Sequence, residues 1–133
     1  RDLTKARTVL KRLQKRFLTL SDRDQESYAA YAAAGGGRCA AVKKMTRVPL
    51  EVMSGAGEGL TQLAAIRDKT NPWLRTDFVI AVDSLLLAFR ASAMNVNGNL
   101  ELCDDPAFVR TVGKESRAIA GVVEKLEKKL KKS

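Results

Sequence analysis

The sequence contains no histidine, only two cysteines and three prolines, and few aromatic side chains among its 133 residues. Without an imidazole the chain has no histidine general base and no histidine metal ligand. Two thiols without histidine cannot complete a standard four-ligand zinc site. No run of consecutive apolar residues approaches the roughly 20 that a transmembrane helix needs. We therefore expect no metal site, no directly bound cofactor and no membrane span.

Positive charge, in contrast, is abundant: 24 Lys and Arg against 15 Asp and Glu give a net charge of +9. Residues 1–20 carry +6, residues 114–133 carry +4, and the stretch between them carries −1. Such a distribution indicates a basic surface that meets nucleic acid, anionic lipid or an acidic protein surface. A solvated face that merely covers the core is the alternative interpretation. The candidate docking residues lie off the apolar stripes of the two ends: Arg12, Lys15, Arg16, Lys125, Lys128 and Lys129.

The hydrophobic pattern is helical throughout the first third of the chain. Apolar residues recur three and four apart from Leu3 to Leu20, which places them on one face of a helix. Ser21 and Asp22 interrupt this pattern, and Ser21 can cap a following helix. Residues 23–34 predict a short alanine-rich helix, which should end at the three glycines Gly35, Gly36 and Gly37.

The remaining segments predict three longer helices and no strand. Residues 38–47 are ambiguous, and Pro49 suits the first position of a helix. Glycines at 55, 57 and 59 indicate either a later helix start, near Glu58, or a close approach of two helices. Asn71-Pro72 and Asp104-Asp105-Pro106 are helix start signals. One domain, residues 1–133, is therefore expected to form an all-α, up-down four-helix bundle with an additional short helix.

Reactive side chains form no convincing catalytic set. Asp77 and Asp83 are six positions apart on one predicted helix and point to different sides. Asp104 and Asp105 are explained as a helix cap, so we expect no catalytic residue and no enzyme. Cys39 and Cys103 lie 64 positions apart. They form either a disulfide, which would stabilise the fold by about 4 kcal/mol, or two free thiols, and the sequence leaves both open.

The string Trp73-Leu74-Arg75-Thr76-Asp77-Phe78 resembles a motif of PsbQ-like proteins, the extrinsic lumenal subunits of photosystem II. The segments Ala81–Leu85 and Val122–Leu126 are similar to later parts of that family, so the resemblance covers about residues 71–132. It implies a four-helix bundle without a catalytic centre that docks on photosystem II and shields the oxygen-evolving centre. It also adds Trp73 and Arg75 to the docking candidates.

The resemblance further implies a place in the chloroplast thylakoid lumen, peripheral to the membrane. The expected partner is a large photosynthetic membrane-protein complex with acidic lumenal surfaces, and no small-molecule substrate is expected. Two alternatives remain open. The chain could be a basic nucleic-acid-binding or ribosome-associated protein, or an accessory subunit of photosystem I or of a mitochondrial complex.

Overall fold

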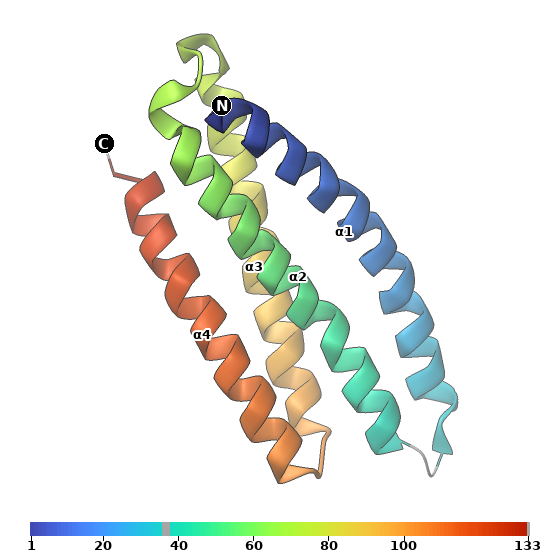
Figure 1. The fold of residues 1–133 in the computed structure, drawn as a ribbon. Helices are drawn as coiled ribbons and strands as arrows, with labels where there is room; N and C mark the ends of the chain where they lie inside the picture. The colour runs from blue at the N-terminus through green and yellow to red at the C-terminus, as the bar shows by residue number, and fades with distance from the viewer. Residues whose placement is uncertain (36–37, 133) are drawn as a thin grey trace.

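The structure is a computed structural model that describes residues 1–35 and 38–132. Four long helices run up and down beside one another, and two short 3-10 helices connect the second to the third (Figure 1). The described residues contain no strand, so the all-α four-helix bundle is confirmed. The elements are α1 (Asp2–Ala33), α2 (Arg38–Ile66), η2 (Arg67–Lys69), η3 (Pro72–Leu74), α3 (Arg75–Glu101) and α4 (Pro106–Leu130).

The core is built around α2. This helix packs against α1, α3 and α4 and buries 15 of its 29 residues, whereas α1 buries three, α3 four and α4 three. One apolar cluster centres on Leu60 and Leu86, and a second on Met53 and Val96. The burial of these side chains is the main force that holds the four helices together.

The glycines of α2 let the neighbouring helices approach closely. A Cβ on Gly55 would lie 2.8 Å from Cε1 of Phe17 on α1, and a Cβ on Gly59 would lie 2.9 Å from Cδ1 of Leu85 on α3. Both distances are shorter than carbon–carbon van der Waals contact. Close helix approach is thus the correct one of the two explanations for this run, and the later helix start near Glu58 is wrong.

Two predicted helix boundaries are wrong. Ser21 and Asp22 do not interrupt α1, and residues 23–34 continue it instead of forming a separate short helix. Pro49 does not begin a helix but lies inside α2, which already contains the ambiguous residues 38–47. Packing of α1 and α2 along their length outweighs these local stop signals. Of the three predicted stop glycines, Gly36 and Gly37 lie outside the described residues.

The start signals in the second half are correct. The Asn71 side chain accepts a hydrogen bond from the Trp73 backbone N–H and caps η3. The Asp105 carboxylate accepts from the backbone N–H groups of Ala107 and Phe108 and caps α4. The apolar stripe of α4 then faces inward, with Val112, Val123 and Leu130 buried.

One helical segment qualifies the argument against a membrane span. Pro72–Glu101 is long and apolar enough to cross a membrane by length and composition alone. Only 22% of its most apolar window is buried inside the protein. This segment contains no long run of consecutive apolar residues, because polar residues such as Asp83 and Arg90 divide it. A count of consecutive apolar residues therefore does not detect it.

Candidate functional site between α1, α2 and α3

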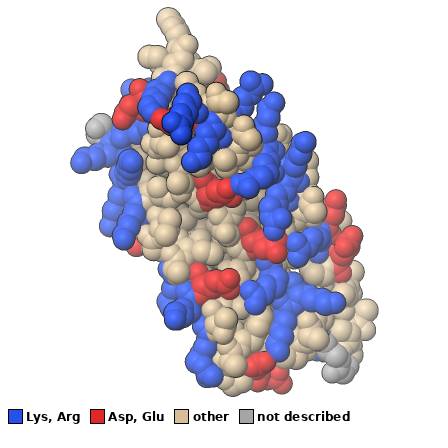
Figure 2. All heavy atoms as spheres, in the orientation of Figure 1, with Lys and Arg blue, Asp and Glu red and all other residues tan. Residues whose placement is uncertain are grey.

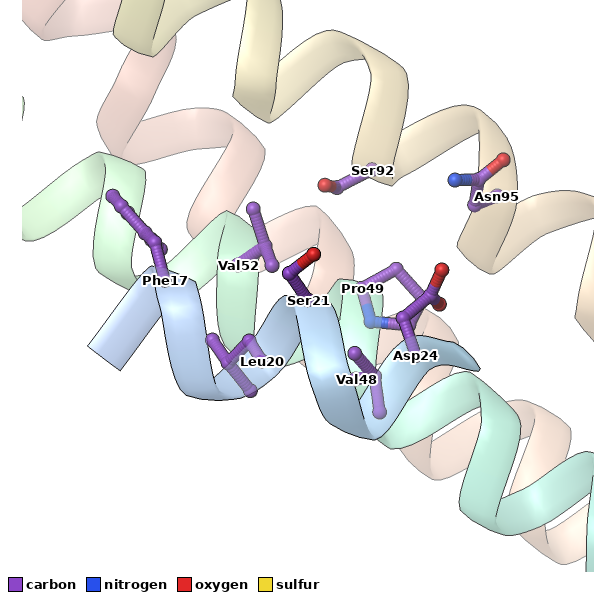
Figure 3. A pocket seen from close by; sticks show the side chains of 9 residues that line it. All are labelled: Phe17, Leu20, Ser21, Asp24, Val48, Pro49, Val52, Ser92 and Asn95. Atoms are coloured by element: carbon purple, nitrogen blue, oxygen red, sulfur yellow. The ribbon is translucent and has the colours of Figure 1, made fainter. Parts of the chain in front are cut away.

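A pocket of about 240 Å³ opens where α1, α2 and α3 meet (Figure 3). Its floor is apolar, and polar side chains stand on α1 and α3 at its sides. A pocket of this kind, with apolar walls and a few convergent polar groups, is the usual form of a small-molecule site. Its lining is Phe17, Leu20, Ser21 and Asp24 from α1, Val48, Pro49 and Val52 from α2, and Ser92 and Asn95 from α3.

The α1 side chains reach the pocket because of their spacing. Leu20 and Ser21 each lie three or four positions from both Phe17 and Asp24, so the four residues share one face of the helix. Leu20 is buried against α2, while Ser21 and Asp24 are exposed. The continuity of α1 through Ser21 therefore matters for the site: a helix break there would turn Asp24 away from α2.

Pro49 shapes the α2 side of the pocket. Proline has no backbone N–H, so it cannot donate the helical hydrogen bond to the carbonyl of Met45, and its ring crowds that carbonyl. Pro49 itself is buried and lines the pocket beside Val48 and Val52. The proline therefore gives the pocket an apolar wall at a point where regular helix packing is disturbed.

Asp24 is the one ionisable side chain that lines the pocket. Among the described residues, no side chain forms an ion pair or a hydrogen bond with its carboxylate, in contrast to Glu51 and Glu58, which bind arginines of α1. Across the pocket, Ser92 is one of only two buried polar residues in the described part of the chain. The pocket thus presents one carboxylate and the polar side chains of Ser21, Ser92 and Asn95 to a ligand.

A second, larger cleft of about 760 Å³ is lined by residues from the connector between α2 and α3, the start of α3 and the end of α4. Its lining carries four basic and two acidic side chains, so we call it the basic cleft, and two of the basic side chains have partners. Arg67 donates hydrogen bonds to the backbone oxygens of Lys129 and Lys132, and Lys131 Nζ lies 3.6 Å from Asp83 Oδ1. These contacts tie the end of α4 to η2 and α3.

The predicted docking residues do not form one surface. Arg12 pairs with Glu58, and Arg16 Nη2 lies 2.8 Å from Glu51 Oε2, so both fasten α1 to α2. The basic residues of α4 lie on the other side of α2, and Figure 2 shows basic side chains along both flanks. The remaining candidates are all exposed: Lys15, Lys125, Lys128, Lys129, Trp73 and Arg75. Of these, Arg75 lines the basic cleft, and Lys128 Nζ lies 3.4 Å from Glu124 Oε1.

The two cysteines, unlike the docking candidates, lie close together in the structure. The Sγ atoms of Cys39 and Cys103 lie 3.8 Å apart as free, half-buried thiols.

Sequence reasoning missed all four polar residues of the pocket. The sequence pattern predicts a helix break at Ser21 and Asp22, with Ser21 as a cap, and this break hides the shared face of Ser21 and Asp24. Ser92 lies at helical spacing from the apolar residues Leu85 and Ala88 of the same helix. A serine on a core-facing stripe is the one local signal that could have indicated a polar cavity there, since buried polar groups require a partner.

Comparison with known proteins points to a different family from the one that the sequence resemblance implied. The family model described as formiminotransferase-cyclodeaminase matches residues 1–118. The crystal structure of formiminotetrahydrofolate cyclodeaminase from Thermotoga maritima matches with a TM-score of 0.87 at 21% sequence identity, over 91% of this chain. The match spans 63% of the length of that protein. No curated protein matches the sequence.

These matches overturn the resemblance to PsbQ-like proteins. The photosystem II function, the photosynthetic partner complex and the thylakoid lumen are therefore wrong, and the nucleic-acid-binding and accessory-subunit alternatives gain no support. The expectation of a non-enzyme is also wrong, since the matching family is described by enzyme activities. The misleading string, Trp73 to Phe78, is a helix start with an apolar face, a pattern that unrelated bundles share.

Proposed function

Because the chain belongs to the formiminotransferase-cyclodeaminase family, we propose that the pocket between α1, α2 and α3 binds the reacting end of a formiminotetrahydrofolate and takes part in its cyclodeamination. The observation that carries this proposal is the extent of the family match. Residues 1–118 include every residue that lines the pocket, whereas the basic cleft draws three of its residues from beyond position 118. The similar fold of a cyclodeaminase supports the same choice.

The chemistry requires one group that can both accept and donate a proton. Cyclodeamination closes a ring with loss of ammonia: a nitrogen of the substrate attacks the formimino carbon and the other nitrogen of that group departs. The attacking nitrogen must lose a proton and the departing nitrogen must gain one. A carboxylate between them performs both transfers. In a chain without histidine, Asp24 is the side chain of this pocket that fits the role.

The other lining residues suit a flat, polar ring. Phe17 and Val52 supply apolar walls, and the polar side chains of Ser21, Ser92 and Asn95 supply hydrogen-bond donors and acceptors. In this proposal the ring system of the folate occupies the pocket of about 240 Å³, and its tail extends from the pocket toward solvent.

Binding can be tested with methyl-labelled protein and 5-formiminotetrahydrofolate as the probe. The methyl resonances of Leu20, Val48 and Val52 should shift on addition of the probe, because these side chains line the pocket. The methyl resonances of Leu130 report on the basic cleft. Shifts confined to Leu130, or no shift at all, would contradict the proposed site.

The role of Asp24 can be tested by the change Asp24→Asn, which keeps the shape of the side chain and removes its basicity. Release of ammonia from the same probe should fall by about 10²-fold or more, while the methyl shifts on binding persist. Asp22→Asn is the matched control, since Asp22 is an exposed carboxylate of α1 that does not line the pocket. Equal rates for the Asp24→Asn variant and the unaltered chain would remove Asp24 from the mechanism.

A further inference from the structure

The only two cysteines of the chain come together from distant parts of the sequence. Cys39 lies in the first turn of α2, and Cys103 lies in the connector between α3 and α4. They are 64 positions apart in sequence, yet their Sγ atoms are separated by 3.8 Å. Both side chains are half-buried, so small reagents can reach them.

The surroundings hold this connector against α2. Lys43 Nζ lies 2.7 Å from Asp105 Oδ2, and the same carboxylate caps α4. The ammonium of Lys43 and the guanidinium of Arg47 also lie 5.5 and 5.6 Å from the centre of the Phe108 ring, within range of cation–π attraction. The approach of the two thiols is therefore supported by several contacts from the same two segments.

We propose that Cys39 and Cys103 form a reversible intramolecular disulfide that joins the start of α2 to the α3–α4 connector. One thiolate attacks a small-molecule disulfide such as oxidised glutathione, giving a mixed disulfide and one molecule of free glutathione. The second cysteine then attacks the mixed disulfide, forms the Cys39–Cys103 bond and releases a second free glutathione. Two protein thiols are oxidised, and one glutathione disulfide is reduced to two thiols. The inference is independent of the ligand of the α1–α2–α3 pocket.

The environment of Cys39 sets the pH dependence of this exchange. Hydrogen bonds with Asp104 and Cys103, together with burial, raise the pKa of the Cys39 thiol above its usual value. The attacking species is the thiolate. Formation of the bond should therefore be slow at neutral pH and should accelerate as the pH rises.

The test is oxidation of the whole chain with glutathione disulfide, followed by mass spectrometry without reduction. The expected product has lost two hydrogen atoms, carries no glutathione and yields a cross-linked peptide that contains Cys39 and Cys103. Because the bond closes a long loop, the oxidised chain should melt about 10 °C higher than the reduced chain. Reduction with dithiothreitol should reverse both changes.

Cys39→Ser and Cys103→Ser are the matched controls. In the reduced state each variant should melt close to the reduced unaltered chain, and neither should gain stability from the oxidant. The proposal is overturned if the unaltered chain ends as a stable glutathione adduct, as a cross-linked pair of chains, or with both thiols still free. It is also overturned if either serine variant gains the same melting shift as the unaltered chain.

Discussion

The two central helices, α2 and α3, are similarly long and apolar but are buried to very different extents. Fifteen of the 29 residues of α2 are buried, against four of the 27 residues of α3. α2 lies between three other helices, whereas α3 packs mainly against α2 and, less extensively, against α4. Apolar composition therefore does not determine burial; the number of neighbouring helices does.

The unburied apolar residues of α3 are ordered along one face. Ile80, Leu87 and Met94 are seven positions apart, and 57%, 68% and 74% of their surfaces are exposed. Residues at this spacing lie on one stripe of a helix. The opposite stripe contains Val82, Leu86 and Val96, which are buried against the other helices. α3 thus has two apolar faces, and only one of them is covered by the residues that the structure describes.

The sharpest test of this contrast replaces one leucine on each helix. Leu60 on α2 is completely buried, so Leu60→Ala should lower the free energy of unfolding by about 3 kcal/mol, through lost burial and a cavity. Leu87→Ala on α3 makes the same chemical change at an exposed position and should cost less than about 0.5 kcal/mol. Urea unfolding followed by circular dichroism measures both. Comparable losses would mean that the outer face of α3 is covered in solution.

Replacing one glycine on each helix by alanine should change the free energy of unfolding by a smaller amount. The change should have opposite signs on the two helices. In Gly59→Ala the new Cβ would press on Leu85, so repacking should lower the free energy of unfolding by about 1 kcal/mol. Gly98 on α3 has no neighbouring atom within 4 Å of its Cβ position, so Gly98→Ala should raise it by about 0.5–1 kcal/mol. The melting temperatures of the two variants should therefore move in opposite directions. If Gly59→Ala also stabilises the protein, Leu85 moves aside without cost, and the glycine is not needed for close packing.

The smallest expected effect is on how the free energy of unfolding depends on pH. It arises from the contact between Lys43 of α2 and Asp105 at the start of α4. Lys43 and the backbone N–H of Phe108 lower the pKa of the Asp105 carboxyl below 3.8. A carboxyl with a lowered pKa in the folded state stabilises the protein above its unfolded pKa, and this contribution is lost as the pH falls through the folded value. As the pH falls below about 4, the Asp105→Asn variant should therefore lose stability less steeply than the unaltered chain.

Lys43→Met provides the matched control for this pH effect, because it removes the ammonium and leaves the carboxyl in place. It should remove part of the same acid dependence, and the double variant should differ little from Asp105→Asn alone. Urea midpoints across the acid range measure all three variants. Additive changes would mean that Lys43 and Asp105 do not act as a pair.

Features that depend on a few neighbouring residues could be predicted from the sequence. The caps at Asn71 and Asp105 are correct because each needs only a side-chain oxygen and the N–H groups of the next turn. The inward stripe of α4 is correct because it follows directly from helical spacing. The four-helix bundle then follows from several such stripes that must cover one another.

Features that depend on packing between distant segments could not be predicted. Pro49 and Ser21 look like helix boundaries locally, but burial along α2 outweighs the cost of a proline within the helix. The pocket needs Asp24 and Ser92 from helices nearly 70 residues apart in sequence, so no local motif contains it. The six-residue string that suggested a photosynthetic protein failed for the same reason: it describes one helix start and nothing of what surrounds it.

The position of Trp73 has a consequence for spectroscopy. It is the sole tryptophan of the chain and lies in η3, just before α3, with 92% of its surface exposed. Its indole ring is surrounded by water in the folded chain as in the unfolded one, so the wavelength of its fluorescence should change little when the bundle melts. A shift of that emission to shorter wavelength, with the helical circular dichroism unchanged, would instead report that another molecule has covered the beginning of α3.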